Sequence, residues 1–156
     1  MKTLLLATLL LAQFSVQLMA QTAATNSSAY NLDSGKQALQ GYDPVAYFTE
    51  KAAVKGQPTI HHTHDGVKYY FNTAANRDAF VASPQRYMPA YGGWCATAMA
   101  KGEKVEIDPK NFKVTNDRLF LFFNAWYGDA KKAWVKDEPA QITLADTNWK
   151  KISGEN

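Results

Sequence analysis

The chain has 156 residues, of which 46% are hydrophobic and 13% aromatic, and its 17 Lys and Arg against 14 Asp and Glu give a formal net charge of +3. This length predicts one domain with its own apolar core. The basic residues are dispersed, which argues against a nucleic-acid partner. The single cysteine, Cys95, excludes a disulfide within the chain and a Cys-x-x-Cys redox motif.

Residues 1–20 have the pattern of a secretory signal peptide. Lys2 supplies a positive start, residues 4–11 are apolar, and Ala20 is a small residue before the expected cut. The apolar stretch is too short for a transmembrane helix. We therefore expect an exported protein, periplasmic or secreted, with no membrane span after signal cleavage.

The expected mature chain begins with residues 21–30, which are polar and small and predict a disordered lead. The ordered domain is then expected over residues 31–156. At its start, Gly41-Tyr42-Asp43-Pro44 predicts a turn that feeds the apolar segment Val45–Phe48. In this setting Asp43 is interpreted as a turn residue that accepts backbone N–H bonds, not as an acid or base.

Two β-hairpins are predicted from their turns. Thr59–Thr63 and Val67–Phe71 flank Asp65-Gly66, a strong hairpin signal. Phe112–Thr115 and Arg118–Phe123 flank Asn116-Asp117 in the same way.

Helix signals lie between and after these hairpins. Thr73 fits the N-cap of the first long helix, and Asn124 is interpreted as the cap of a later one. The expected helices cover Ala74–Ala82, a turn from Pro84, a run from Ala96 to near Gly102, Trp126–Val135 and Pro139–Trp149. The predicted fold class is α+β, with two β-hairpins packed against four or five short helices. We expect Trp126, Trp134 and Trp149 to clamp the terminal helices onto the sheet.

Eight segments carry a resemblance to a known family: Gly41–Phe48, Gly66–Phe71, Arg77–Phe80, Ser83–Tyr87, Tyr91–Ala96, Ile107–Pro109, Leu119–Leu121 and Asp146–Trp149. Together they resemble the YHS domain family, in its exported bacterial single-domain branch. The resemblance covers about Leu32 to Trp149.

The resemblance implies a small α+β domain of the YHS type, and it also bears on metal binding. YHS domains that accompany metal-transport ATPases and some oxygenases are thought to bind metal through cysteines. The positions in this chain that match those cysteines are Ala46 and Asn72, and neither is a soft metal ligand. Any metal site in this chain must therefore use other residues.

The remaining candidate ligands fall into two pairs. His62 and His64 are two apart on a predicted strand and so share a face, whereas the neighbouring His61 points away. Cys95 and Met99 are four apart on a predicted helix and are expected to share a face. Imidazole, thiolate and thioether together suit copper, with zinc as the other metal considered. The leading expectation is a non-catalytic binding module for a transition metal such as copper, with Cys95, His62, His64 and Met99 as ligands.

Two alternatives stay open at this point. A thiol at a helix start favours the thiolate, which fits a single-cysteine redox protein or a thiol-dependent enzyme with His62 or His64 as base. A buried Cys95 instead fits a structural or partner-binding domain. The sequence identifies no protein partner and assigns no catalytic residue.

Overall fold

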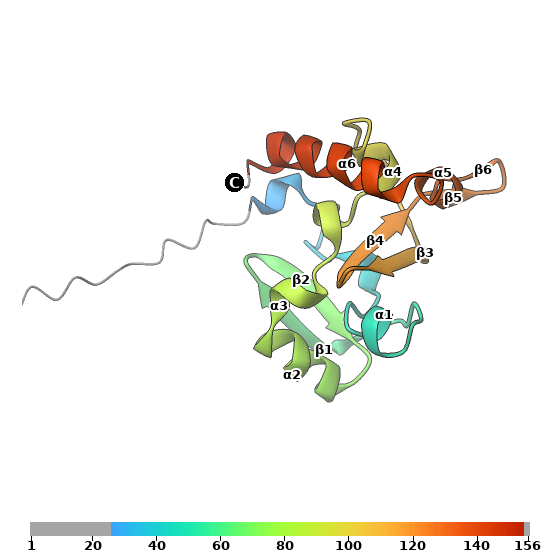
Figure 1. Ribbon diagram of the computed structural model, residues 1–156. Coiled ribbons are helices and arrows are strands. Elements are labelled where there is room, and N and C mark those ends of the chain that lie inside the picture. The colour runs from blue at the N-terminus through green and yellow to red at the C-terminus, as the bar shows by residue number, and fades with distance from the viewer. Residues whose placement is uncertain (1–25, 155–156) are drawn as a thin grey trace, which may run out of the picture.

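The computed structural model describes residues 26–154 (Figure 1). The predicted signal peptide over residues 1–20 and the lead as far as residue 25 lie outside the described residues. Residues 26–30, which the sequence places in the disordered lead, include a 3-10 turn, η1 (Ser27–Ala29). Ala29 is buried, and its carbonyl accepts a hydrogen bond of 2.7 Å from the indole N–H of Trp94. This part of the lead therefore packs onto the domain.

The α+β prediction is confirmed: residues 26–154 form six α-helices and three two-stranded antiparallel sheets (Figure 1). The strands are β1 (Gln57–His64), β2 (Val67–Phe71), β3 (Asp108–Thr115), β4 (Arg118–Phe122), β5 (Asn124–Ala125) and β6 (Gly128–Asp129). The helices are α1 (Ala46–Thr49), α2 (Ala74–Ala82), α3 (Pro84–Tyr87), α4 (Ala96–Met99), α5 (Lys131–Trp134) and α6 (Glu138–Ser153), with 3-10 turns η2 (Leu39–Gly41) and η3 (Ala90–Gly93). None of the helices described is long and apolar enough to cross a membrane.

The two predicted hairpins are present, and their turns explain their register. Asp65 and Gly66 have φ values of 48° and 79°, and Asn116 and Asp117 have 51° and 55°. Two successive residues with positive φ match the twist of antiparallel strands, which is why Asp-Gly and Asn-rich pairs favour this connection.

Local capping fixes the ends of the longer helices. The Thr73 side chain accepts a hydrogen bond of 3.1 Å from the backbone N–H of Asn76, as predicted for the start of α2. The Asp137 side chain does the same for α6 through Ala140, at 3.3 Å. Helix α6 ends at Gly154, which adopts the left-handed conformation with φ of 74°.

Strand β4 separates two apolar clusters. Its residues Leu119 and Leu121 belong to the cluster formed with the β1–β2 hairpin, α1 and α2, whereas Phe120 and Phe122 belong to the cluster beneath α6. All four side chains are fully buried. Because successive side chains of a strand point to opposite faces, one strand covered on both faces forms the shared wall of the two clusters. Figure 1 shows β4 between α6 and the β1–β2 hairpin.

The predicted helix over Trp126–Val135 is wrong for most of its length. Residues 124–129 form the third hairpin, and only Lys131–Trp134 are helical. The reason lies in a long-range contact, since the Asp129 carboxylate accepts hydrogen bonds from the Asn111 side chain (2.8 Å) and from the Lys131 backbone (3.0 Å). The helix therefore starts after Asp129.

The tryptophan prediction is wrong for one of the three residues. Trp134 and Trp149 are buried, with 0% and 8% exposure, and they pack in the cluster beneath α6. Trp126 is 97% exposed and does not clamp a helix, because it lies at the tip of the β5–β6 hairpin.

Candidate functional site

Cys95 lies in the interior, between η3 and α4, with 1% exposure. Its backbone N–H donates to the carbonyl of Val105 at 3.0 Å, and it forms an isolated bridge with Leu121 of β4. Its side chain belongs to the first apolar cluster. A thiol in this position reaches no solvent reagent unless the surrounding structure opens locally.

Met99 is fully buried, but it belongs to the second cluster, with Phe120 and Trp134. Cys95 is the N-cap residue of α4 and has non-helical backbone angles, φ −58° and ψ 119°. The four-residue spacing therefore does not place the two sulfur atoms on one helical face, because that rule holds only between helical residues. The expectation of a shared Cys95–Met99 face is wrong.

The shared face of the histidine pair is confirmed. His62 and His64 both contact the ring of Phe80 on α2, with ring centroids 6.3 and 6.1 Å apart. His61 points to the other side of β1, where its ring lies 6.4 Å from Tyr70 and its Nδ1 lies 2.9 Å from the carbonyl oxygen of Pro58. We call the group of His62, His64, Tyr69 and Phe80 the histidine cluster.

Two polar atoms of the histidine cluster are shielded from solvent and have no hydrogen-bond partner among residues 26–154. They are Nε2 of His64 and the hydroxyl oxygen of Tyr69. The nearest charge to His64 is the Asp65 carboxylate, with 3.6 Å between Nε2 and Oδ2. Buried polar atoms are hydrogen-bonded in nearly all native structures, which makes these two atoms candidates for binding a water molecule or a ligand.

The Tyr69 hydroxyl stays protonated over the ordinary pH range. Burial raises the pKa of Tyr69 well above its usual value, and the nearby Tyr30 and Asp65 raise the pKa further. Its ring lies 4.7 Å from that of Phe80, so it shares the surroundings of the two histidines. It therefore offers a hydrogen-bond donor to this region instead of an anionic oxygen.

The four ligands expected from the sequence do not form one coordination shell. The histidine pair contacts α2, whereas Cys95 and Met99 pack along β4 and beneath α6. Within the described residues, no group of three or more His, Cys, Asp or Glu is placed to hold a metal ion.

Asp43 is fully buried, and its carboxylate is fully used in the fold. It accepts hydrogen bonds from the backbone of Val45 (2.8 Å), Ala46 (3.4 Å) and Asn72 (2.8 Å), and from the side chain of Asn76 (2.7 Å). These bonds confirm its role as a turn residue. They tie the turn before α1 to the end of β2 and the start of α2.

A second polar network was missed by sequence reasoning. The Tyr91 hydroxyl donates to Asp146 Oδ1 at 2.9 Å, and Arg118 donates two hydrogen bonds, of 2.7 and 3.2 Å, to the same carboxylate. Tyr91 and Arg118 line a cavity of about 240 Å³ together with Met88 and Trp149. Both the Arg118 guanidinium and the Asp146 carboxylate are engaged with each other, so the network holds α6 to η3 and β4. No motif in the sequence connects these three residues, because they come from three separate elements.

The β5–β6 hairpin presents the most exposed aromatic residues of the described chain, Trp126 at 97% and Tyr127 at 68%. The sequence signal for this turn was the Trp-Tyr-Gly-Asp segment, since Gly disfavours a helix and favours a turn.

In comparisons with known proteins, no protein-family model, curated protein or solved structure matches this chain.

Proposed function

We propose that this protein is an exported, non-catalytic binding module of the YHS type, and that its ligand is a transition-metal ion bound at the histidine cluster. The observation that supports this most directly is Nε2 of His64, which is shielded from solvent and has no hydrogen-bond partner among residues 26–154. A buried nitrogen without a partner costs free energy. Metal coordination by the neutral imidazole removes that cost, and His62 on the same face provides a second nitrogen.

The ligand types favour particular metals. With Cys95 and Met99 in the apolar clusters, the accessible donors are the imidazoles of His62 and His64 and the carboxylate of Asp65. Nitrogen and oxygen donors suit Cu(II) and Zn(II), whereas Cu(I) prefers sulfur. Cu(II) is expected to bind more tightly than Zn(II), as it does at most sites of this kind. Water molecules complete the shell in this proposal.

The non-catalytic part of the proposal is supported by the surroundings of Cys95 and Asp43. Cys95 is 1% exposed, which opposes a thiol-dependent mechanism. Asp43 has its carboxylate oxygens occupied by four hydrogen bonds. Export rests on the signal pattern of residues 1–20.

Calorimetric titration of the mature chain with Cu(II) and Zn(II) tests the proposal. We expect one ion per chain, and at least a tenfold loss of affinity in His64→Gln, since one coordinating bond disappears. His62→Gln is expected to weaken binding as well. His61→Gln is the matched control, because His61 neighbours both residues in sequence but lies on the other face of β1.

Cys95→Ser serves as the second control, and its metal affinity is expected to equal that of the wild type. Thermal unfolding of every variant establishes that the fold is intact. An unchanged affinity in His64→Gln, or an equal loss in His61→Gln, would contradict the proposed site.

A structural or partner-binding domain with a buried cysteine is the second candidate function. It is favoured by the burial of Cys95 and by the exposed aromatic residues of the β5–β6 hairpin. A chain that binds neither metal in the titration leaves this candidate as the better one.

A further inference from the structure

The β5–β6 hairpin projects from the body of the molecule, beyond α5 (Figure 1). Its turn residues, Trp126 and Tyr127, are 97% and 68% exposed. Their rings pack edge to face, with centroids 5.2 Å apart and planes at 85°, and Tyr127 also contacts Phe123 at 5.7 Å. Trp126 and Tyr127 therefore form one ordered, exposed aromatic surface at the tip of the hairpin, which we call the wedge.

The base of the hairpin is held in place by hydrogen bonds to β3. Asn124 donates to the Asp108 carboxylate at 3.2 Å, and Asp129 accepts from Asn111 at 2.8 Å. Asn124 also pairs with Asp129 across the hairpin. The fold thus holds a tryptophan and a tyrosine in water, an arrangement typical of an interaction site.

We propose that this hairpin is a membrane anchor, in which Trp126 and Tyr127 insert into the interfacial layer of an anionic phospholipid bilayer. Tryptophan and tyrosine combine an apolar ring with a polar N–H or O–H group, and they favour the boundary between lipid tails and headgroups. This inference is independent of the metal site, since it uses none of the residues of the histidine cluster.

The size and shape of the wedge favour a bilayer over a protein partner. Two aromatic side chains bury roughly 300–500 Å² together, whereas a stable protein interface buries about 800 Å² on each partner. The wedge is a projecting hairpin tip, and a bilayer accepts such a tip without a matching pocket. Val135, which follows α5, is 53% exposed and adds apolar surface close to the hairpin in sequence.

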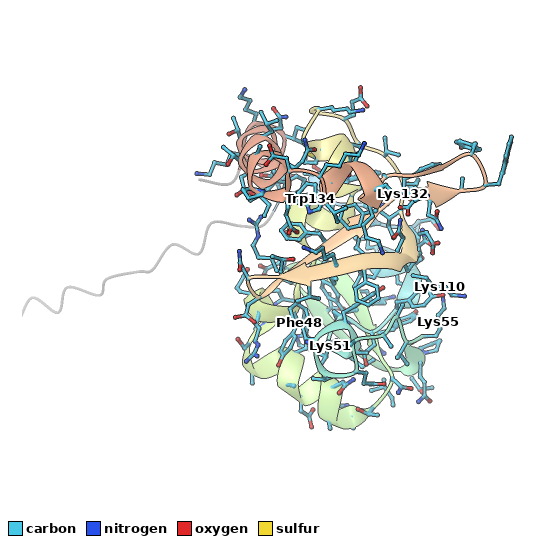
Figure 2. The ribbon with its side chains drawn as sticks, turned by 45° about the vertical axis from the view of Figure 1, so that its right-hand side comes forward. Phe48, Lys51, Lys55, Lys110, Lys132 and Trp134 are labelled. Carbon is cyan, nitrogen blue, oxygen red and sulfur yellow. The ribbon has the colours of Figure 1, made fainter. Side chains whose placement is uncertain are left out.

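Lysines near the hairpin complement anionic headgroups. Lys131 and Lys132 are the first residues of α5, which begins two residues after the end of β6. Lys110 lies in the irregular part of β3, between Asp108 and Phe112. Figure 2 shows Lys132, Lys110 and Lys55 along the side of the molecule from which the hairpin projects. Basic side chains near an anionic surface strengthen attachment.

The acidic residues of this region do not cancel that attraction at the tip. Asp108 and Asp129 both lie at the base of the hairpin and are engaged there, Asp108 with Asn124 and the Lys110 backbone, and Asp129 with Asn111. The turn itself, Trp126-Tyr127, carries no charge.

The test uses the mature chain and vesicles of phosphatidylcholine with or without phosphatidylglycerol. Tryptophan emission is expected to shift to shorter wavelength with the anionic vesicles. The shift should come mainly from Trp126, which is 97% exposed, since Trp134 and Trp149 are buried and Trp94 is half-buried. Trp126→Ala combined with Tyr127→Ala is expected to weaken co-sedimentation about a hundredfold, roughly tenfold for each aromatic side chain withdrawn from the bilayer.

Two matched controls distinguish binding through the hairpin from nonspecific adsorption of the protein to vesicles. Leu144→Ala removes a side chain that is 50% exposed on α6, and it is expected to leave vesicle binding unchanged. Lys110→Glu combined with Lys132→Glu should weaken binding to anionic vesicles and reduce its salt dependence. The same exchange at Lys150 and Lys151, at the far end of α6, should have a smaller effect.

Two results would overturn the anchor. One is an emission spectrum that anionic vesicles leave unchanged. The other is concentration-dependent self-association of the wild type that the double aromatic variant abolishes, which would assign the hairpin to a second copy of the chain.

Discussion

The indole N–H of Trp134, the last residue of α5, donates a hydrogen bond of 2.9 Å to Oε1 of Glu138, four residues further along the chain. Trp134 is fully buried beneath α6, and Glu138 is the first residue of that helix. The other carboxylate oxygen of Glu138 accepts a hydrogen bond from Lys113 of β3. The carboxylate of Glu138 thereby joins the apolar cluster beneath α6 to the β3–β4 hairpin.

This carboxylate makes stability depend on pH on the acid side. Burial by itself raises the pKa of Glu138, but hydrogen bonds from Lys113, Trp134 and Thr115 lower the pKa below its ordinary value. The group therefore stabilises the fold above the pKa it has in the unfolded chain, about 4.3. That contribution disappears as pH falls through the lower pKa of the folded state.

Glu138→Gln is therefore expected to lower the free energy of unfolding by about 1–3 kcal/mol at neutral pH. The difference from the wild type should shrink as pH falls below about 4. Urea denaturation at several pH values measures both effects. Glu103→Gln, at an exposed position, is the control and should change neither. A constant difference across the pH range would contradict this role of Glu138.

Asp43→Ala is expected to be strongly destabilising. Removing this fully buried carboxylate leaves three backbone N–H groups and the Asn76 amide without their acceptor, which costs about 3 kcal/mol or more. Asn76→Ala removes only one of the four donors, so a loss of about 1 kcal/mol is expected. Chemical denaturation of both variants gives the comparison, and equal losses would show that the network does not centre on Asp43.

Gly92→Ala is expected to cost about 2–4 kcal/mol. Gly92 has φ of +59°, and an added Cβ would lie 2.7 Å from a ring carbon of Trp149 and 2.9 Å from one of Tyr30. Backbone strain and steric overlap therefore act together. Gly128→Ala is the matched control, since nothing lies within 4 Å of its added Cβ. Thermal denaturation should show a change of at most about 0.5 kcal/mol for Gly128→Ala.

Cys95 is expected to react with iodoacetamide only when the protein unfolds, because 1% of the residue is exposed. The rate of labelling should rise with denaturant in parallel with unfolding. The reference is a Cys95→Ala variant that also carries Ser83→Cys, which places one thiol at an exposed position. Its labelling should be fast without denaturant. Equally fast labelling of the wild type would restore the thiol-dependent alternative.

The amino-acid sequence by itself determined the features that depend on neighbouring residues. Asp65-Gly66 and Asn116-Asp117 specify their hairpins because these residues tolerate positive φ, and Thr73 starts α2 because its hydroxyl caps a backbone N–H three residues away. The alternation that puts His62 and His64 on one face of β1 is equally local.

Only the tertiary structure decided the features that depend on distant residues. Asn111 binds Asp129 and so replaces a predicted helix with the exposed Trp126-Tyr127 turn. Strand β4 separates the cluster that holds Cys95 from the one that holds Met99, and the burial that leaves His64 Nε2 without a partner in the described residues arises from packing against α2. The physical reason is that φ preferences and side-chain periodicity act over a few residues, whereas burial and hydrogen-bond competition depend on which segments the folded chain brings together.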